Sequence, residues 1–273
     1  KFLKKQKQSL LVKPMKYGVI SGGKKIRSTV ILDAGKIFNI KEKKLLNICA
    51  AVECIHSYSL IHDDLPCMDN DAIRRGKPST HIKFGEASAV LAGSSLLTLA
   101  FEIISDTKYS INYKSKNEII RSLASCSGHT GIAGGQELDL KFENKKKKIN
   151  QIIDMQKKKT GKLFNFCLYS VGVIANKNKN EKKYLSDLGE EIGLLFQLAD
   201  DFLDKKGTQH LVGKSVKKDN KKGKSTLLNL MGDKRAYLYA SNLKKKILRK
   251  LEKHGKKAKE LTSTIEFILE RKF

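Results

Sequence analysis

Hydrophobic residues recur at intervals of three and four along most of the chain, as they do on the buried face of a helix. The clearest example is the stretch LLNICAAVECIHSYSLIHDD from Leu45, which Pro66 must end or kink because proline lacks a backbone N–H. The same period predicts further helices over residues 26–38, 86–104, 117–127, 149–175, 181–203, 227–253 and 260–271. Period-two alternation with β-branched residues is scarce. The pattern therefore predicts an all-α fold.

The composition supports one helical body with a substantial core. The chain has 273 residues, 40% of them apolar, with 3 prolines and no tryptophan. Leucine, isoleucine, alanine, lysine and glutamate fill the long periodic stretches, and most of these residue types favour helix. The loops are short and basic, and no repeat at a solenoid period is present. We expect a single domain over residues 1–273, built as a helical bundle.

The charge is strongly positive, with a formal net value of +27. Lysines gather in runs such as 145–148 and 157–159. No aromatic interleaving and no nucleic-acid motif accompanies them, so we interpret this charge as a solvated surface and expect no nucleic-acid partner.

Cysteines and hydropathy indicate the compartment. The five cysteines are odd in number and lack paired spacing, which indicates neither a disulfide framework nor a zinc site. The most apolar stretch, from Ala87, is interrupted by Ser94, Ser95 and Thr98, so we expect no membrane span. No signal peptide is visible near Lys1, and we expect a cytoplasmic protein.

Two acidic clusters each follow an apolar helical stretch. The first, HDDLPCMDND, carries Asp63, Asp64, Asp69 and Asp71, and the break at Pro66 is expected to fold the chain back so that Asp63 and Asp69 meet. The second, FQLADDFLD, places Asp200 and Asp204 one above the other on a helix. Together they predict an all-oxygen site for a hard divalent cation, with Mg²⁺ as the natural candidate because it binds substrate phosphates through a few carboxylates.

Basic residues stand in short motifs, several of which contain glycine. The motifs are GGKKIR, RRGK, KKKTGK, VGKS and GKST. Arginine and lysine both bind phosphate oxygens, and glycine permits a close approach of the backbone to a ligand. GGKKIR is not a Walker A loop, because its glycine spacing differs and no buried strand precedes it. These motifs predict that an anionic group is held beside the metal.

Taken in order, these motifs resemble those of the short-chain trans-prenyltransferases, the polyprenyl synthase family, and most of all its bacterial farnesyl diphosphate synthases. The resemblance runs from KYGVISGGKKIR through both aspartate motifs to IEFILERKF and covers nearly the whole chain. It implies an all-helical fold around a central cavity, usually in a homodimer. It also implies a reaction in which an allylic diphosphate, dimethylallyl or geranyl, ionises and alkylates isopentenyl diphosphate.

The resemblance implies a role for each matching residue. Carboxylates that would bind magnesium, expected as three ions with Mn²⁺ as an alternative, are Asp63, Asp64, Asp69, Asp200, Asp201 and Asp204. Residues that would clamp the allylic diphosphate are Arg74, Lys159, Lys214 and Lys224. Residues that would hold isopentenyl diphosphate are Lys24, Arg27, His56 and Arg75. Thr160 and Gln197 would face the developing cation, and Gln136 and Asp139 would line the site. Ser28 stands where the family usually has proline.

Product length depends on the wall of the apolar tunnel below the metals. Tyr58 lies five residues before Asp63, so its ring projects from the same helix one to two turns deeper, with Ser59 beside it. This aromatic resembles that of the bacterial farnesyl synthases and predicts a C15 product. The LPCMDND stretch also resembles plant-type geranylgeranyl synthases, which leaves C20 as the alternative.

Three other functions have weaker support from the sequence. A catalytically silent prenyltransferase-like subunit typically lacks one aspartate motif, and this chain has both. A nucleic-acid-binding helical protein does not explain acidic clusters at the ends of apolar helices. A terpene cyclase shares the helical fold and the use of magnesium, but it does not need the second basic group of Lys24, Arg27 and Arg75.

Overall fold

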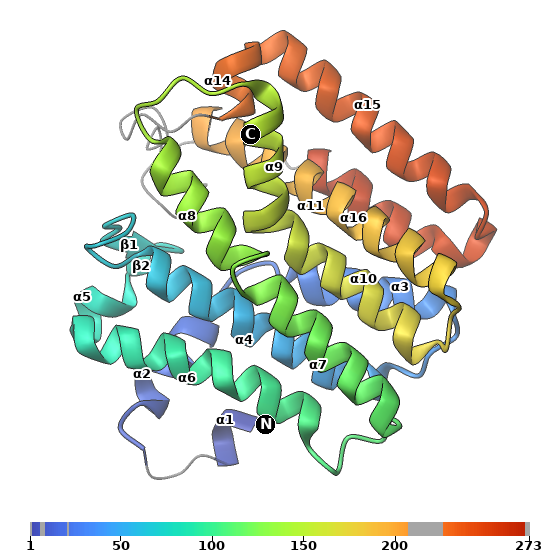
Figure 1. Cartoon of the computed structure of the whole chain (residues 1–273), viewed down its shortest axis with the longest axis horizontal. Coiled ribbons are helices and arrows are strands. Elements are labelled where there is room, and N and C mark those ends of the chain that lie inside the picture. The colour runs from blue at the N-terminus through green and yellow to red at the C-terminus, as the bar shows by residue number, and fades with distance from the viewer. Residues whose placement is uncertain (1, 6–8, 21, 207–225, 271–273) are drawn as a thin grey trace.

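The computed structural model describes residues 2–5, 9–20, 22–206 and 226–270, and these are almost entirely helical (Figure 1). Two strands of two residues each, β1 (Ile73–Arg74) and β2 (Lys77–Pro78), form an antiparallel hairpin. The described residues contain no other strand. In chain order the helices are α1 (Phe2–Lys5), α2 (Val12–Ile20), α3 (Ile26–Ile37), η1 (Glu42–Lys44), α4 (Leu46–Asp63), α5 (Thr80–Phe84), α6 (Glu86–Ser105), α7 (Tyr113–Ser127), α8 (Ile132–Phe142), α9 (Ile149–Gln156), the π-helical turn η2 (Lys157–Gly161), α10 (Lys162–Ile174), α11 (Lys179–Lys206), α14 (Leu227–Met231), α15 (Asp233–Glu252), η3 (Gly255–Ala258) and α16 (Lys259–Glu270). The prediction of an all-α fold is confirmed.

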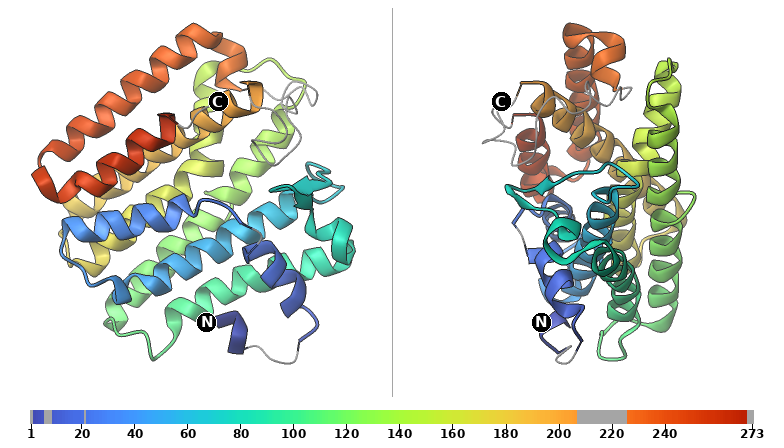
Figure 2. Two further views of the ribbon diagram at one scale, coloured as in Figure 1. Left: turned by 180° about the vertical axis from the view of Figure 1, so that it is seen from behind. Right: turned by 90° about the vertical axis from the view of Figure 1, so that its left-hand side faces the viewer.

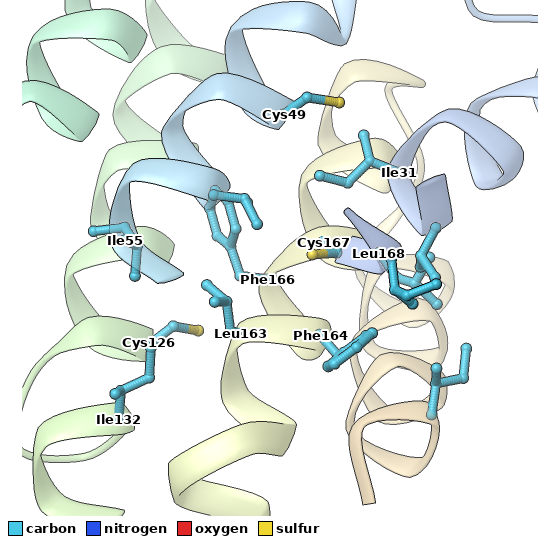
Figure 3. Packing of buried hydrophobic residues seen from close by; sticks show 14 of the residues in the cluster. Ile31, Cys49, Ile55, Cys126, Ile132, Leu163, Phe164, Phe166, Cys167 and Leu168 are labelled. Carbon is cyan, nitrogen blue, oxygen red and sulfur yellow. The ribbon is translucent and has the colours of Figure 1, made fainter. Parts of the chain in front are cut away.

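The helix α10 lies at the centre of the bundle and packs along α11, α7 and α3, while α4 packs along α6. Figure 3 shows Phe166 and Cys167 of α10 among side chains of α3, α4 and α7. Both α10 residues are fully buried, as are most of its apolar side chains, which explains why this helix is mainly apolar. The helices α6 and α15 lie on opposite sides of the bundle (Figures 1 and 2).

The predicted helices are largely present, and two of them are interrupted. The stretch 149–175 is not one regular helix, because the π turn η2 separates α9 from α10. The stretch 227–253 is divided at Gly232, whose φ of 75° is a conformation that glycine adopts at little cost. The helices α2 and α8 were not predicted; α2 contains Pro14 and α8 contains two glycines within its first turn.

One apolar helix has the dimensions of a membrane span. Among the described residues, α6 alone is long and apolar enough to cross a membrane by length and composition. Its residues Ala92, Leu96 and Ile104 are fully buried against the protein interior. Helices in the interior of a protein pass the same test, and α6 packs closely along α4.

The last helix is attached to α3 by a polar contact that offers a first test. Thr264 of α16 donates a hydrogen bond to the buried carboxylate of Asp33 at 2.7 Å. Burial raises the pKa of Asp33, and the Thr264 hydroxyl opposes that rise. Replacing Thr264 by Val should lower the free energy of unfolding by about 1–3 kcal/mol, the cost of leaving a buried acceptor without its donor. Urea unfolding measures this, with the exposed Ser263→Ala as the control; equal losses for both variants would contradict the assignment.

Candidate active site

The first acidic cluster lies where α4 ends, and the chain turns back on itself there. The backbone N–H of Asp69 donates to the carbonyl of Asp63 at 2.8 Å, and that of Asp71 donates to the carbonyl of Asp64 at 3.0 Å. Pro66 stands inside this turn, where it cannot continue the helix. The expected fold-back is therefore present, and it brings Asp69 beside the last residue of α4.

Asp63 is half-buried, and the charges around it only partly balance its own. Burial raises the pKa of Asp63 to about 6; the positive charge of Lys159 opposes the rise, and the negative charge of Asp69 adds to it. A carboxylate pushed towards its neutral form by burial and by a second carboxylate is stabilised by a nearby cation. The environment of Asp63 is thus suited to a positive ion.

Asp64 has a different environment from Asp63, although both were expected to bind metal. The guanidinium of Arg74 donates from Nε to both carboxylate oxygens of Asp64, at 3.0 and 3.2 Å, and from Nη2 to Oδ1. Nη2 also lies 3.4 Å from Oδ2 of Asp71. Such a two-pronged pair fixes the plane of the guanidinium. In this arrangement Asp64 and Asp71 orient Arg74 at the edge of the acidic cluster.

The second acidic cluster lies in the last two turns of α11. Asp201 accepts hydrogen bonds from the side-chain amides of Gln156 at 3.1 Å and Gln197 at 2.9 Å. Gln197 in turn accepts from the hydroxyl of Thr160 at 2.8 Å. Asp201 and Asp204 are buried, and Asp200 is partly exposed. Gln156 was not among the predicted site residues, because nothing in its sequence context marks it.

The π turn η2 places Lys159 and Thr160 between the two acidic clusters. Lys159 Nζ lies 2.7 Å from Oδ2 of Asp139 on α8. A Cβ at Gly135 would lie 2.2 Å from the backbone nitrogen of Lys159, and a Cβ at Gly193 would lie 2.6 Å from Cα of Gly161. Only glycine allows α8 and α11 to approach the turn this closely. Interrupted helical turns of this kind occur frequently at functional sites.

The contacts of η2 connect the two helix ends. Lys159 acts electrostatically on Asp63 of α4, and the adjacent Thr160 is bonded to Gln197 of α11. Figures 1 and 2 show α4 and α11 ending on the same side of the bundle. The two acidic clusters, separated by more than a hundred residues in the sequence, therefore face the same region.

A separate group of cations surrounds His56 on α4. Burial lowers the pKa of His56 well below its usual value, and the positive charges of Arg27, Arg75, Lys25 and Arg74 lower it further. Lys25 pairs with Glu53 at 3.1 Å, and Glu53 also accepts a hydrogen bond from Ser28, the residue found in place of the usual proline. An imidazole that stays neutral among four cations indicates a pocket made for an anion.

Two arginines of this group make no direct ion pair among the described residues, although the Glu53 carboxylate acts on both from a distance. Arg75 donates to the carbonyl of Gly22 at 2.7 Å, and Arg27 lies over the rings of Phe164 and Phe196 at 4.9 and 5.4 Å. Neither arginine has an ion pair within the described part of the chain, and Nε of Arg27 has no hydrogen-bond partner there. Both arginines retain donors for a phosphate group.

The donor set fits magnesium with a diphosphate better than a bare metal ion. Within the described ranges, no three His, Cys, Asp or Glu side chains are placed to hold one ion by themselves. Mg²⁺ keeps several waters and is usually bound by one or two carboxylates together with substrate phosphates. Each aspartate cluster can supply that number of carboxylates. Both amide atoms of the buried Gln136 find no partner among the described residues, which indicates a polar ligand there.

The remaining predicted residues divide into three groups. Tyr58 and Ser59 are buried on α4, one turn and more before Asp63. Lys24 is exposed at the start of α3, with its ammonium 5.1 Å from the ring of Phe267 on α16. Lys214 and Lys224 lie outside the described residues, as does most of the link between α11 and α14.

Comparison with known proteins places this arrangement in a family. The family model of polyprenyl synthetase matches residues 8–266. Farnesyl diphosphate synthase of Escherichia coli is 38% identical over 96% of this chain and 89% of its own length. Geranylgeranyl pyrophosphate synthase 4 of Arabidopsis thaliana is 35% identical over 95% of this chain and 70% of its own length. A crystal structure of geranyltransferase from Helicobacter pylori, complexed with magnesium and isoprenyl diphosphate, has a TM-score of 0.84 at 32% identity and covers 97% of this chain and 88% of that one.

The fold and the site define an all-helical prenyltransferase. The chain belongs to the polyprenyl synthetase family, as both the family model and the relatives show. The resemblance of its motifs to this family is thereby confirmed.

Proposed function

We propose that this enzyme condenses isopentenyl diphosphate with an allylic diphosphate, dimethylallyl or geranyl, and makes farnesyl diphosphate. The observation that carries the proposal is the convergence of two acidic helix ends on the π turn η2, with a second, cationic pocket around His56. A reaction between two diphosphates requires two such anion sites. The relatives' names support the same chemistry.

The chemistry explains the residue types. The C–O bond of the allylic diphosphate breaks and the diphosphate leaves with the electron pair, so negative charge grows on the departing oxygens. Magnesium bound by Asp63, Asp69 and Asp200 would stabilise that charge on the leaving group. Lys159 and Arg74 would add fixed positive charges, which act most strongly when the charge is fully developed. Neither Lys159 nor Arg74 needs to move, because Asp139 and Asp64 hold them.

The second substrate would bind at the other pocket. Arg27, Arg75 and the neutral His56 would hold the diphosphate of isopentenyl diphosphate, whose double bond attacks the allylic carbon. The hydroxyl of Thr160 and the amide oxygen of Gln197 would turn their negative ends toward the allylic cation. The proton released after condensation would pass to the departed diphosphate, so no protein base is invoked.

The direct test is product formation. Isopentenyl and geranyl diphosphates with Mg²⁺ should give a C15 alcohol after phosphatase treatment, and chelation with EDTA should stop the reaction. Formation of C20 as the main product would select the alternative, a geranylgeranyl diphosphate synthase. If no condensation occurs with any allylic starter, the chain is a catalytically silent subunit and the proposal fails.

The second pocket can be tested separately from the first. Replacing Arg75 by Ala should raise KM for isopentenyl diphosphate by about 10- to 100-fold, because a hydrogen bond to a charged group contributes about 1.5–3 kcal/mol. KM for geranyl diphosphate should change little. Lys77→Ala, in the same hairpin but exposed, is the matched control. Equal rises in the KM values for both substrates would show that Arg75 does not bind isopentenyl diphosphate selectively.

We also propose that the enzyme is a cytoplasmic homodimer. The outer face of α6 exposes the large apolar side chains of Val90 and Leu91, at 42% and 54% of their surfaces. A second copy that covers this face would remove both from water. Light scattering should give twice the mass of the chain, and Leu91→Glu should yield monomer; an unchanged dimer in that variant would exclude this face.

A further inference from the structure

His62 opens the first acidic motif and has no role in the proposed reaction. It lies in the last turn of α4, directly before Asp63, and its Nε2 lies 3.0 Å from the carbonyl oxygen of Val90 on α6. A carbonyl oxygen only accepts hydrogen bonds, so Nε2 carries the proton. The ring fits because α6 has a glycine beside it: a Cβ at Gly93 would lie 2.2 Å from Nε2. Gly93 and Val90 thus form a slot in α6 that holds one orientation of His62.

The same imidazole contacts Tyr58 one turn earlier on α4. The two rings meet edge to face, with centroids 5.5 Å apart and planes at 88°. This is a favourable arrangement for an aromatic pair. The other end of Tyr58 reaches α7, where its hydroxyl donates to the carbonyl of Ser127 at 3.4 Å, the long limit for such a bond. Tyr58 is therefore contacted from two sides, by the imidazole of His62 at its ring and by the carbonyl of Ser127 at its hydroxyl.

We propose that His62, seated in the slot formed by Gly93 and Val90, is a positioning residue that keeps the Tyr58 ring across the growing chain and so limits product length. The inference rests on the proposed function, because it assigns a role within that reaction. A ring stops elongation only if it stays in place, and an aromatic side chain on a helix has another staggered rotamer into which it swings when space opens. His62 and Gly93 close that space from the α6 side without touching the substrate.

The test compares product length across five variants. His62→Ala removes the ring and its hydrogen bond; His62→Gln removes the ring but keeps a donor for the Val90 carbonyl; Gly93→Ala pushes the imidazole out of its slot. Tyr58→Ala removes the wall itself, and Tyr58→Phe removes only the bond to Ser127. Each protein is incubated with isopentenyl and geranyl diphosphates and Mg²⁺, and the C20 to C15 product ratio is read by chromatography, with circular dichroism as the check on folding.

We expect His62→Ala, His62→Gln and Gly93→Ala each to raise the C20 to C15 ratio by about tenfold, the low end of what one methylene is worth in a shaped apolar pocket. Tyr58→Ala should raise the ratio further, and Tyr58→Phe should leave it near the wild-type value. The rate of the first condensation, measured with geranyl diphosphate, should stay within about threefold, because no contact to the reacting atoms is lost.

Each other outcome overturns the inference in a recognisable way. If Tyr58→Ala lengthens the product but the His62 and Gly93 variants do not, His62 has no positioning role. If His62→Gln behaves as wild type, the hydrogen bond to α6 matters and the ring contact does not. If Tyr58→Phe alone lengthens the product, Ser127 holds the wall. Absence of any condensation by the wild-type protein would refute the proposed function itself, which the other outcomes leave intact.

Discussion

Replacing Asp63 by Asn is expected to lower kcat by about 10³-fold, the loss seen when one charge-stabilising group is removed from the site of a developing negative charge. Asp200→Asn should have a similar effect from the other helix end. Both changes keep the shape of the side chain and remove only its charge. Steady-state rates with geranyl and isopentenyl diphosphates and saturating Mg²⁺ measure the loss.

The stability of the Asp63 variant gives a second, independent readout. Burial raises the pKa of Asp63 to about 6, so the ionised group destabilises the folded protein at neutral pH relative to an ordinary aspartate. The thermal midpoint of Asp63→Asn should therefore equal or exceed that of the wild type while activity is lost. Asp187→Asn is the control, because Asp187 lies on the exposed side of α11 with Lys183. Wild-type rates in Asp63→Asn would remove the metal assignment.

Gly193→Ala should reduce both stability and activity although it touches no substrate. Its new Cβ would lie 2.6 Å from Cα of Gly161 and 3.2 Å from the nitrogen of the same residue, and backbone atoms cannot rotate away. The π turn must then shift, with Lys159 and Thr160 on it. We expect a loss of about 1–3 kcal/mol in unfolding free energy from the overpacking. The expected fall in kcat is about 10²-fold, since a misplacement of about 1 Å has that effect.

Gly172→Ala is the matched control for this variant. Gly172 is also a helical glycine in the interior, but its new Cβ would first meet side-chain atoms, Cδ1 of Leu185 at 2.9 Å and Cγ of Lys182 at 3.3 Å, which can shift more easily than backbone. It should cost less stability and leave kcat near the wild-type value. If both alanine variants lose activity equally, then tight packing in general, and not the position of η2, accounts for the effect.

The sequence predicted those parts of the site whose conformation depends on residues close together in the chain. The helix before Asp63 follows from the spacing of its apolar residues, and the turn after it follows from Pro66. The pairing of Asp200 with Asp204 on one helical face needs no tertiary information either. For the same reason, the bounds of the helices predicted over residues 26–38 and 86–104 agree with those of α3 and α6 to within one residue.

The features missed by the sequence analysis depend on contacts between distant segments. The π turn interrupts a stretch with unbroken helical periodicity, and it is associated with close approaches at Gly135 and Gly193 that no local pattern reveals. The first turn of α8 contains two glycines, which have a low helix propensity, and the helix is stabilised by its packing against η2. The pairing of Arg74 with Asp64 likewise depends on the path of the hairpin. Tertiary packing decided each of these.

In the proposed enzyme, the ends of α4 and α11 share metal ions around one diphosphate. Crystals grown with Mn²⁺ and a non-hydrolysable allylic diphosphate analogue should show anomalous difference peaks between the carboxylates of Asp63 and Asp69 on one side and Asp200 on the other. Each peak should lie about 2.1 Å from a carboxylate oxygen, the distance of a small octahedral divalent ion. Peaks absent from this region, or ions bound to one helix end with the diphosphate elsewhere, would contradict a shared metal site.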